Sequence, residues 1–83
     1  MNAMEIISAA RDQIAALTSL PVDTVSRFKR EGDGWVVEIE LVEMRRIPNS
    51  SDVLATYQIQ LDSDGSLLSY QRTQRYYRGQ VKE

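Results

Sequence analysis

The chain has 83 residues, of which 42% are hydrophobic and 27% charged, and its net charge is −2. This composition fits one small soluble domain and argues against a general nucleic-acid-binding protein. The chain has no cysteine and no histidine, which excludes disulfides and removes the usual metal ligands and the usual general base. We therefore expect no enzyme, no cofactor and no metal site.

The first predicted element is an amphipathic helix over residues 3–18. Asn2 and Glu5 fit a capping box at its start, and Pro21 disfavours helical geometry just after its end. A helix of about 15 residues is not stable alone in water, so its apolar side must pack on another element. The apolar side of the helix is predicted to consist of residues spaced by three and four, namely Ala3, Ile7, Ala10, Ile14 and Leu17.

Four antiparallel strands are predicted to follow between residues 22 and 77. The first is irregular, because the spacing of Val25 and Phe28 breaks strict alternation and predicts a bulge. Turn residues separate strands expected at residues 22–30, 35–42, 53–61 and 67–77. The prediction is a single α+β domain over residues 1–83, with the helix packed on a sheet of about four strands in two layers. A short basic C-terminal tail would follow.

Alternation along the strands also predicts which side chains face water. Trp35 and the odd-numbered residues after it should face the helix, and Leu68 and Tyr70 should reach the same core. Glu38 and Glu40 should lie on the opposite face, which we expect to be largely solvated. Two carboxylates on an open sheet surface predict no catalytic pair, since general acid–base chemistry needs a pocket that perturbs one pKa.

Positive charge gathers at the end of the second long strand and near the C-terminus. The candidate partner-binding residues in these segments are five arginines and one tyrosine: Arg45, Arg46, Arg72, Arg75, Tyr76 and Arg78. In a regular strand, Arg72 and Arg78 would share one face with Tyr76, and Arg75 would lie on the other. Two interpretations are level: a docking surface for an acidic partner, or charge that protects an edge strand from aberrant pairing. Contact with nucleic acid is disfavoured by the negative total charge.

Two segments of the sequence form a recognisable pattern. Residues 35–48 read WVVEIELVEMRRIP, and residues 52–57 read DVLATY. Together with Gly65, Tyr70 and the arginine-rich ending, they resemble the central motif of the gas vesicle protein O family. The resemblance covers more than half of the chain, and the preceding helix is compatible with it.

The resemblance implies an accessory protein of gas vesicle formation in the cytoplasm of a buoyant or gas-vesicle-bearing prokaryote. Our leading hypothesis is a non-catalytic assembly factor that contacts other gas vesicle proteins, with the six residues of the basic segments facing an acidic surface. The alternative is a ligand- or nucleic-acid-binding regulator of vesicle production that uses the basic aromatic C-terminal segment. No apolar run is long enough for a membrane span, and the first residues do not resemble a signal peptide. Dimerisation through an exposed sheet edge remains open.

Overall fold

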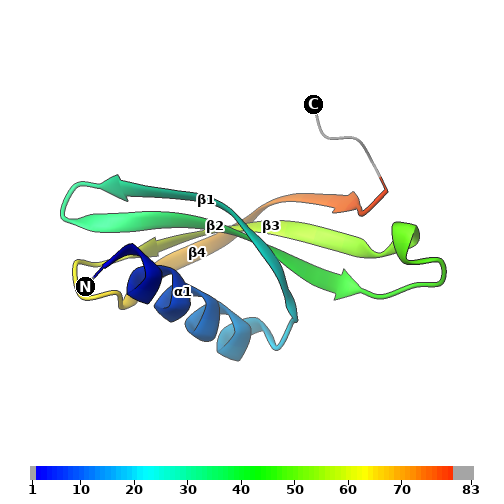
Figure 1. Cartoon of the computed structure of the whole chain (residues 1–83), viewed down its shortest axis with the longest axis horizontal. Helices are drawn as coiled ribbons and strands as arrows, with labels where there is room; N and C mark the ends of the chain where they lie inside the picture. Colours follow the sequence, from blue (N-terminus) through cyan, green and yellow to red (C-terminus); the bar gives the residue numbers. More distant parts are fainter. Residues whose placement is uncertain (1, 80–83) are drawn as a thin grey trace.

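The computed structural model describes residues 2–79. Within them lie one helix and four strands: α1 (Ala3–Thr18), β1 (Val22–Glu31), β2 (Gly34–Met44), β3 (Val53–Leu61) and β4 (Leu67–Tyr77), with a short 3-10 helix η1 (Asn49–Ser51). The strands form one antiparallel sheet in the order β1-β2-β3-β4, and α1 covers one of its faces (Figure 1). The predicted α+β fold is confirmed. Of the predicted C-terminal tail, which was expected to begin after about residue 77, residues 80–83 lie outside the described residues.

Local signals set both ends of α1. The Glu5 backbone N–H donates to the Asn2 side chain at 2.9 Å, and the Asn2 backbone N–H donates to the Glu5 carboxylate at 3.0 Å. This is the predicted capping box. At the other end Ser19 takes a left-handed conformation (φ 59°), and its N–H donates to the Ala15 carbonyl at 2.8 Å. The chain then leaves the helix towards Pro21.

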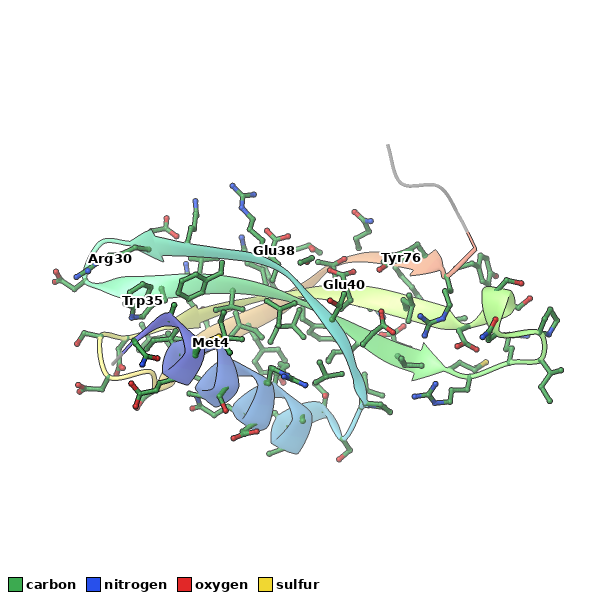
Figure 2. The ribbon with its side chains drawn as sticks, viewed as in Figure 1. Met4, Arg30, Trp35, Glu38, Glu40 and Tyr76 are labelled. Atoms are coloured by element: carbon green, nitrogen blue, oxygen red, sulfur yellow. The ribbon has the colours of Figure 1, made fainter. Side chains whose placement is uncertain are left out.

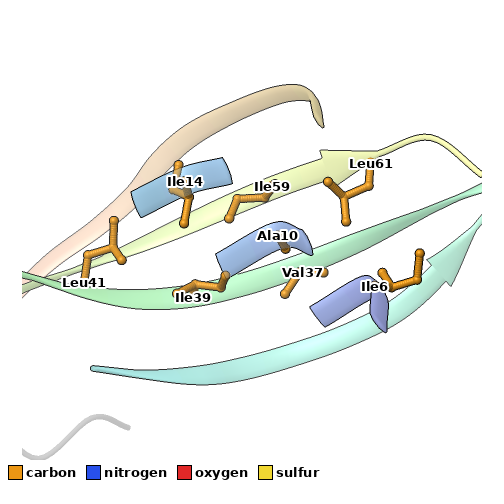
Figure 3. Close-up of a cluster of buried hydrophobic side chains, with 8 residues drawn as sticks. All are labelled: Ile6, Ala10, Ile14, Val37, Ile39, Leu41, Ile59 and Leu61. Atoms are coloured by element: carbon orange, nitrogen blue, oxygen red, sulfur yellow. The ribbon is translucent and has the colours of Figure 1, made fainter. Parts of the chain in front are cut away.

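The hydrophobic core lies between the middle of α1 and the two central strands (Figure 3). The predicted burial of Ala3 and Leu17 is wrong, because they lie at the two ends of the helix and only its middle packs closely on the sheet; Leu17 is 56% exposed. Phe28 and Trp35 stack with ring centroids 5.3 Å apart and pack against the core. The fully buried members are Ile6, Ala10, Ile14, Val37, Ile39, Leu41, Ile59 and Leu61.

A bulge near the start of β4 changes which of its residues reach the core. Leu67 pairs with Leu61, and Ser69 with Gln60, so Leu68 is an extra residue in the ladder. Leu67 packs against the core, whereas Leu68 is 65% exposed and Tyr70 is 43% exposed. The prediction that Leu68 and Tyr70 enter the core is therefore wrong. Leu68 is the extra residue of the bulge, and Tyr70 pairs with Ile59 on the helix-covered face but lies on the edge strand, where it stays partly exposed.

A second bulge in β4 lies at Thr73. Arg72 pairs with Tyr57, and Arg75 pairs with Ala55, so both arginines point to the helix-covered face of the sheet. Tyr76 pairs with Leu54 and points to the opposite face. The prediction that Arg72 and Tyr76 share a face is wrong, because strict alternation does not hold across a bulge.

One side chain of α1 holds the turn between β3 and β4. The Gln13 amide nitrogen donates to the Gly65 carbonyl at 2.8 Å, and its amide oxygen accepts from the Leu67 N–H at 2.9 Å. The same nitrogen donates to the Ala9 carbonyl at 3.0 Å. Gln13 thus supplies partners to two backbone groups at the edge of the core.

Replacing Gln13 with alanine is expected to lower the free energy of unfolding by about 1–3 kcal/mol, because two backbone groups of the turn lose their partners. Asp12→Ala, at an exposed neighbouring position of the same helix, should change it by no more than about 0.5 kcal/mol. Urea unfolding of both variants measures the difference. Equal stabilities would show that the Gln13 contacts contribute nothing.

Candidate partner-binding site

Two exposed arginines lie at one end of the elongated molecule, which measures 41 × 27 × 20 Å. Arg45 and Arg46 follow β2 and begin the connection to β3, at the same end as the last residues of β4 (Figure 1). None of the ion pairs formed within residues 2–79 includes either arginine. The next residue, Ile47, is fully exposed, and Met44 is 45% exposed. Unneutralised charge and apolar surface therefore lie side by side here.

Asp52 fixes the connection between β2 and β3 although it is almost fully buried. Its carboxylate accepts from the Arg46 backbone N–H at 2.7 Å and from Arg78 Nε at 3.2 Å. Its carbonyl accepts from the Arg78 N–H at 2.8 Å. The Arg46 N–H and the Arg78 guanidinium hold the pKa of Asp52 below its usual value, against the opposing effect of burial. The sequence pattern did not single out Asp52 as an anchor, because its partners lie up to 26 residues away.

Asp52→Asn is expected to destabilise the protein at neutral pH, and this deficit should shrink at low pH. The folded-state pKa of Asp52 is lowered, so its stabilising contribution is complete above the unfolded-state pKa and falls as the pH drops below about 4. Urea midpoints of both proteins between about pH 7 and about pH 3 test this. A deficit independent of pH would show that the ionised carboxylate contributes nothing.

The other three predicted arginines are paired with acidic side chains. One carboxylate oxygen of Glu43 on β2 lies 3.1 Å from Arg72 Nη1, and the other lies 2.9 Å from Arg75 Nε. A single carboxylate therefore forms ion pairs with two guanidinium groups. Arg78 is 2.9 Å from Asp23 of β1, and this hydrogen bond raises the pKa of its guanidinium. Burial, with the charge of Glu43, also raises the pKa of Tyr57.

A cleft with a volume of about 380 Å³ brings together three of the six predicted partner-binding residues. Arg46 and Arg75 provide its positive charge, and Tyr76 forms part of its wall. Arg45 adjoins Arg46 in the chain, whereas Arg72 and Arg78 do not line the cleft. The full lining is Arg46, Val53, Arg75, Tyr76 and Tyr77. The arrangement suits a negatively charged group attached to an apolar or aromatic segment.

The Tyr76 hydroxyl connects this cleft to a buried carboxylate. It donates to Glu40 at 2.6 Å, and the Thr56 and Ser26 hydroxyls donate to the same carboxylate at 2.6 Å each (Figure 2 labels Glu40 and Tyr76). Hydroxyl bonds of this length are typical of an ionised acceptor. Burial raises the pKa of the Tyr76 phenol well above its usual range, so it stays protonated and can donate.

This network corrects the prediction for the sheet face opposite the helix. Glu40 is only 3% exposed, although it was expected to be solvated, and Thr56 on the same face is 4% exposed. Glu38 is different: its side chain is 23% exposed and lies 3.7 Å from Arg27. The network contains one residue from each strand: Ser26, Glu40, Thr56 and Tyr76. Its hydrogen bonds therefore link all four strands on the sheet face that α1 does not cover.

Two features are absent from the described part of the chain. Residues 2–79 contain no group of three or more acidic side chains placed to hold a metal ion. No described helix combines the length and apolar character needed to cross a membrane.

Comparison with known proteins identifies the family. The family model described as gas vesicle synthesis protein GvpO matches residues 1–82. Gas vesicle protein O of a Streptomyces species is 40% identical over 76 residues, which are 92% of this chain and 59% of that protein. Gas vesicle protein O of Haloferax mediterranei is 44% identical over 52 residues, covering 63% of this chain and 37% of that protein.

A further relative is gas vesicle protein O1 of Halobacterium salinarum, with 30% identity over 74 residues, covering 89% of this chain and 62% of that protein. The chain thus spans less than two thirds of the length of each of these relatives. No solved structure matches it. The match of the family model over nearly the whole chain confirms what residues 35–48 and 52–57 indicated: the chain belongs to the gas vesicle synthesis protein GvpO family.

Proposed function

We propose that this chain is a non-catalytic accessory factor in gas vesicle synthesis that acts by binding an acidic surface of another gas vesicle protein. Family membership supports the role in vesicle synthesis. Neither the family description nor the names of the relatives state a reaction. In this proposal the chain acts in the cytoplasm, in contact with other gas vesicle proteins.

The observation that carries the proposal is the state of Arg45 and Arg46. Both are exposed and outside every ion pair formed within residues 2–79, and both adjoin the fully exposed Ile47. Arginine beside an exposed apolar side chain is typical of protein–protein interfaces, in which a few such residues carry most of the binding energy. We define the basic end as Arg45, Arg46 and Ile47 together with the adjoining cleft, and we assign partner binding to it.

The paired arginines weaken the alternative of a nucleic-acid-binding regulator. Glu43 offsets Arg72 and Arg75, and Arg78 lies between Asp23 and Asp52. Phosphate binding needs cations whose charge is available, and the chain as a whole is negative. Binding to an acidic protein surface needs fewer free cations and fits the basic end better.

Reversing both charges, as Arg45→Glu with Arg46→Glu, is expected to reduce vesicle number by about tenfold or more in a strain that depends on this chain. The expected cause is slower association with the acidic partner. Vesicles are counted by electron microscopy, and captured gas vesicle proteins are identified by mass spectrometry. The capture by the unaltered chain should weaken as salt rises.

The matched control is Arg11→Glu with Lys29→Glu, which makes the same change in total charge at two exposed positions elsewhere. Circular dichroism verifies that both double variants fold. Normal vesicle numbers and unchanged capture with the Arg45 and Arg46 variant would contradict the proposal. Equal losses with both variants would assign the effect to total charge and contradict it as well.

A further inference from the structure

The end of the molecule opposite the basic end carries a second cleft. Its lining residues come from the β1–β2 and β3–β4 turns and the adjoining strand ends. These turns lie at the far end of the longest dimension from the β2–β3 connection (Figure 1). Its volume is about 340 Å³. Trp35 and Leu68 are among its apolar lining residues, and Glu31, Asp33 and Asp62 supply negative charge. We call it the acidic cleft.

Two features of the acidic cleft favour an occupant that combines an apolar side chain with positive charge. The bulge at Leu68 leaves this wall residue 65% exposed, and an exposed leucine beside a cleft is surface that a partner can cover. Arg30 lies over the Trp35 ring at 5.2 Å from its centroid (Figure 2). Its guanidinium is therefore engaged by the ring, while none of the ion pairs within residues 2–79 includes Glu31 or Asp33.

The basic end has the complementary chemistry. Ile47 is fully exposed, and the two residues before it are Arg45 and Arg46. An apolar side chain preceded by two cations matches a cleft that combines apolar residues with the three carboxylates of Glu31, Asp33 and Asp62. The two surfaces lie at opposite ends of a molecule 41 Å long, so one chain cannot bring them together.

We propose that Ile47 of one copy docks in the acidic cleft of a second copy, with Arg45 and Arg46 against Glu31 and Asp33. The contact joins two different surfaces, so a pair of copies keeps one free basic end and one free acidic cleft. Such a head-to-tail contact makes rings or open chains rather than a two-fold dimer. The inference rests on the proposed function in using the same basic end, and it names a second copy of this chain as an occupant of that end.

The cross-section of the molecule limits the area that this contact can bury. A cross-section of 27 × 20 Å allows roughly 400 Å² of contact on each copy, about half of what a stable complex buries. The association is therefore weak and reversible, and it is favoured where the local concentration of the chain is high. Its ion pairs make it sensitive to salt.

Sedimentation equilibrium of the full chain tests the proposal, from about 10 µM to about 1 mM and at about 50 mM and 500 mM salt. At low salt the average mass should rise with concentration beyond that of a dimer, and high salt should suppress the rise. Arg45→Ser with Ile47→Ser removes two of the three docking side chains, and Glu31→Lys with Asp33→Lys reverses the charge of two of the cleft's carboxylates. Each double variant alone should remain monomeric.

An equimolar mixture of the two double variants is the decisive sample. One retains an intact acidic cleft and the other an intact basic end, so they should form a heterodimer that cannot grow. Three outcomes would each overturn the proposal. The wild-type chain could stay monomeric at about 1 mM and low salt, or it could form a closed dimer that neither variant disturbs. The mixture of the two variants could also stay monomeric.

The cleft variant also separates this inference from the proposed function. Glu31→Lys with Asp33→Lys leaves the basic end intact, so it should still capture other gas vesicle proteins while failing to self-associate. An unaltered chain that captures gas vesicle proteins but stays monomeric would overturn the inference alone. Capture that survives Arg45→Glu with Arg46→Glu would overturn the proposed function, whatever the mass measurements show.

Discussion

Replacing Glu40 with alanine is expected to lower the free energy of unfolding by about 2–4 kcal/mol. The carboxylate accepts hydrogen bonds from Ser26, Thr56 and Tyr76, each at 2.6 Å, and it is only 3% exposed. Its removal takes the acceptor from three hydroxyls and leaves a space between strands. A domain of 83 residues has a total stability of roughly 4–12 kcal/mol, so this loss is a large fraction. Urea unfolding at neutral pH measures it.

Glu38→Ala is the matched control, because Glu38 lies on the same strand and face but pairs with Arg27 at 3.7 Å near the surface. Its expected cost is at most about 1 kcal/mol. Tyr76→Phe removes one of the three donors and should cost about 1–2 kcal/mol. Equal costs for the alanine variants of Glu38 and Glu40 would show that the buried network does not stabilise the sheet.

The elements that were predicted correctly depend on interactions between near neighbours in the chain. The helix over residues 3–18 follows from apolar periodicity, and its start from a capping box three residues long. The bulge expected in the first strand is present, with register shifts on either side of Val25. Alternation in residues 35–42 also predicted which side chains of β2 face the helix.

The bulges in β4 could not be predicted, because an extra residue in a ladder is set by pairing with β3 and has no distinct composition. Each bulge displaces the following side chains relative to simple alternation, which is why Leu67 takes the core position expected of Leu68, and why Arg72 and Tyr76 lie on different faces. The burial of Glu40 was missed for a similar reason. Its signal is Thr56 directly opposite on β3, which becomes visible only once the register is known.

The sequence indicated which residues could form the candidate site, but not which of its arginines form ion pairs with acidic side chains. Arg45 and Arg46 are adjacent in sequence, so their joint exposure at a strand end could be expected. The partners of the other arginines could not: Glu43 is 29 residues from Arg72, and Asp23 is 55 residues from Arg78. Those ion pairs depend on which strands are neighbours and how β4 is bulged. Of the five arginines predicted to bind a partner, Arg45 and Arg46 are the two that form no ion pair within residues 2–79.

Gly34→Ala is expected to destabilise the protein by about 3 kcal/mol or more, because there is no room for a Cβ atom at this position. An added Cβ would overlap the backbone carbonyl oxygen of Leu61 and lie 3.2 Å from its carbonyl carbon. These atoms belong to the neighbouring strand, which can move only if the pairing of β2 with β3 opens. Thermal unfolding followed by circular dichroism should show a large loss in Tm or an unfolded chain.

Gly32→Ala separates this collision from a general intolerance of side chains in the β1–β2 turn. Gly32 has φ +59°, and a Cβ there would meet nothing within 4 Å. Its replacement should cost only the conformational penalty of a left-handed residue, about 1 kcal/mol. If Gly34→Ala were as mild as Gly32→Ala, β2 and β3 would be further apart at this end than described. Because Gly34 also lines the acidic cleft, the shape of that cleft would then be wrong as well.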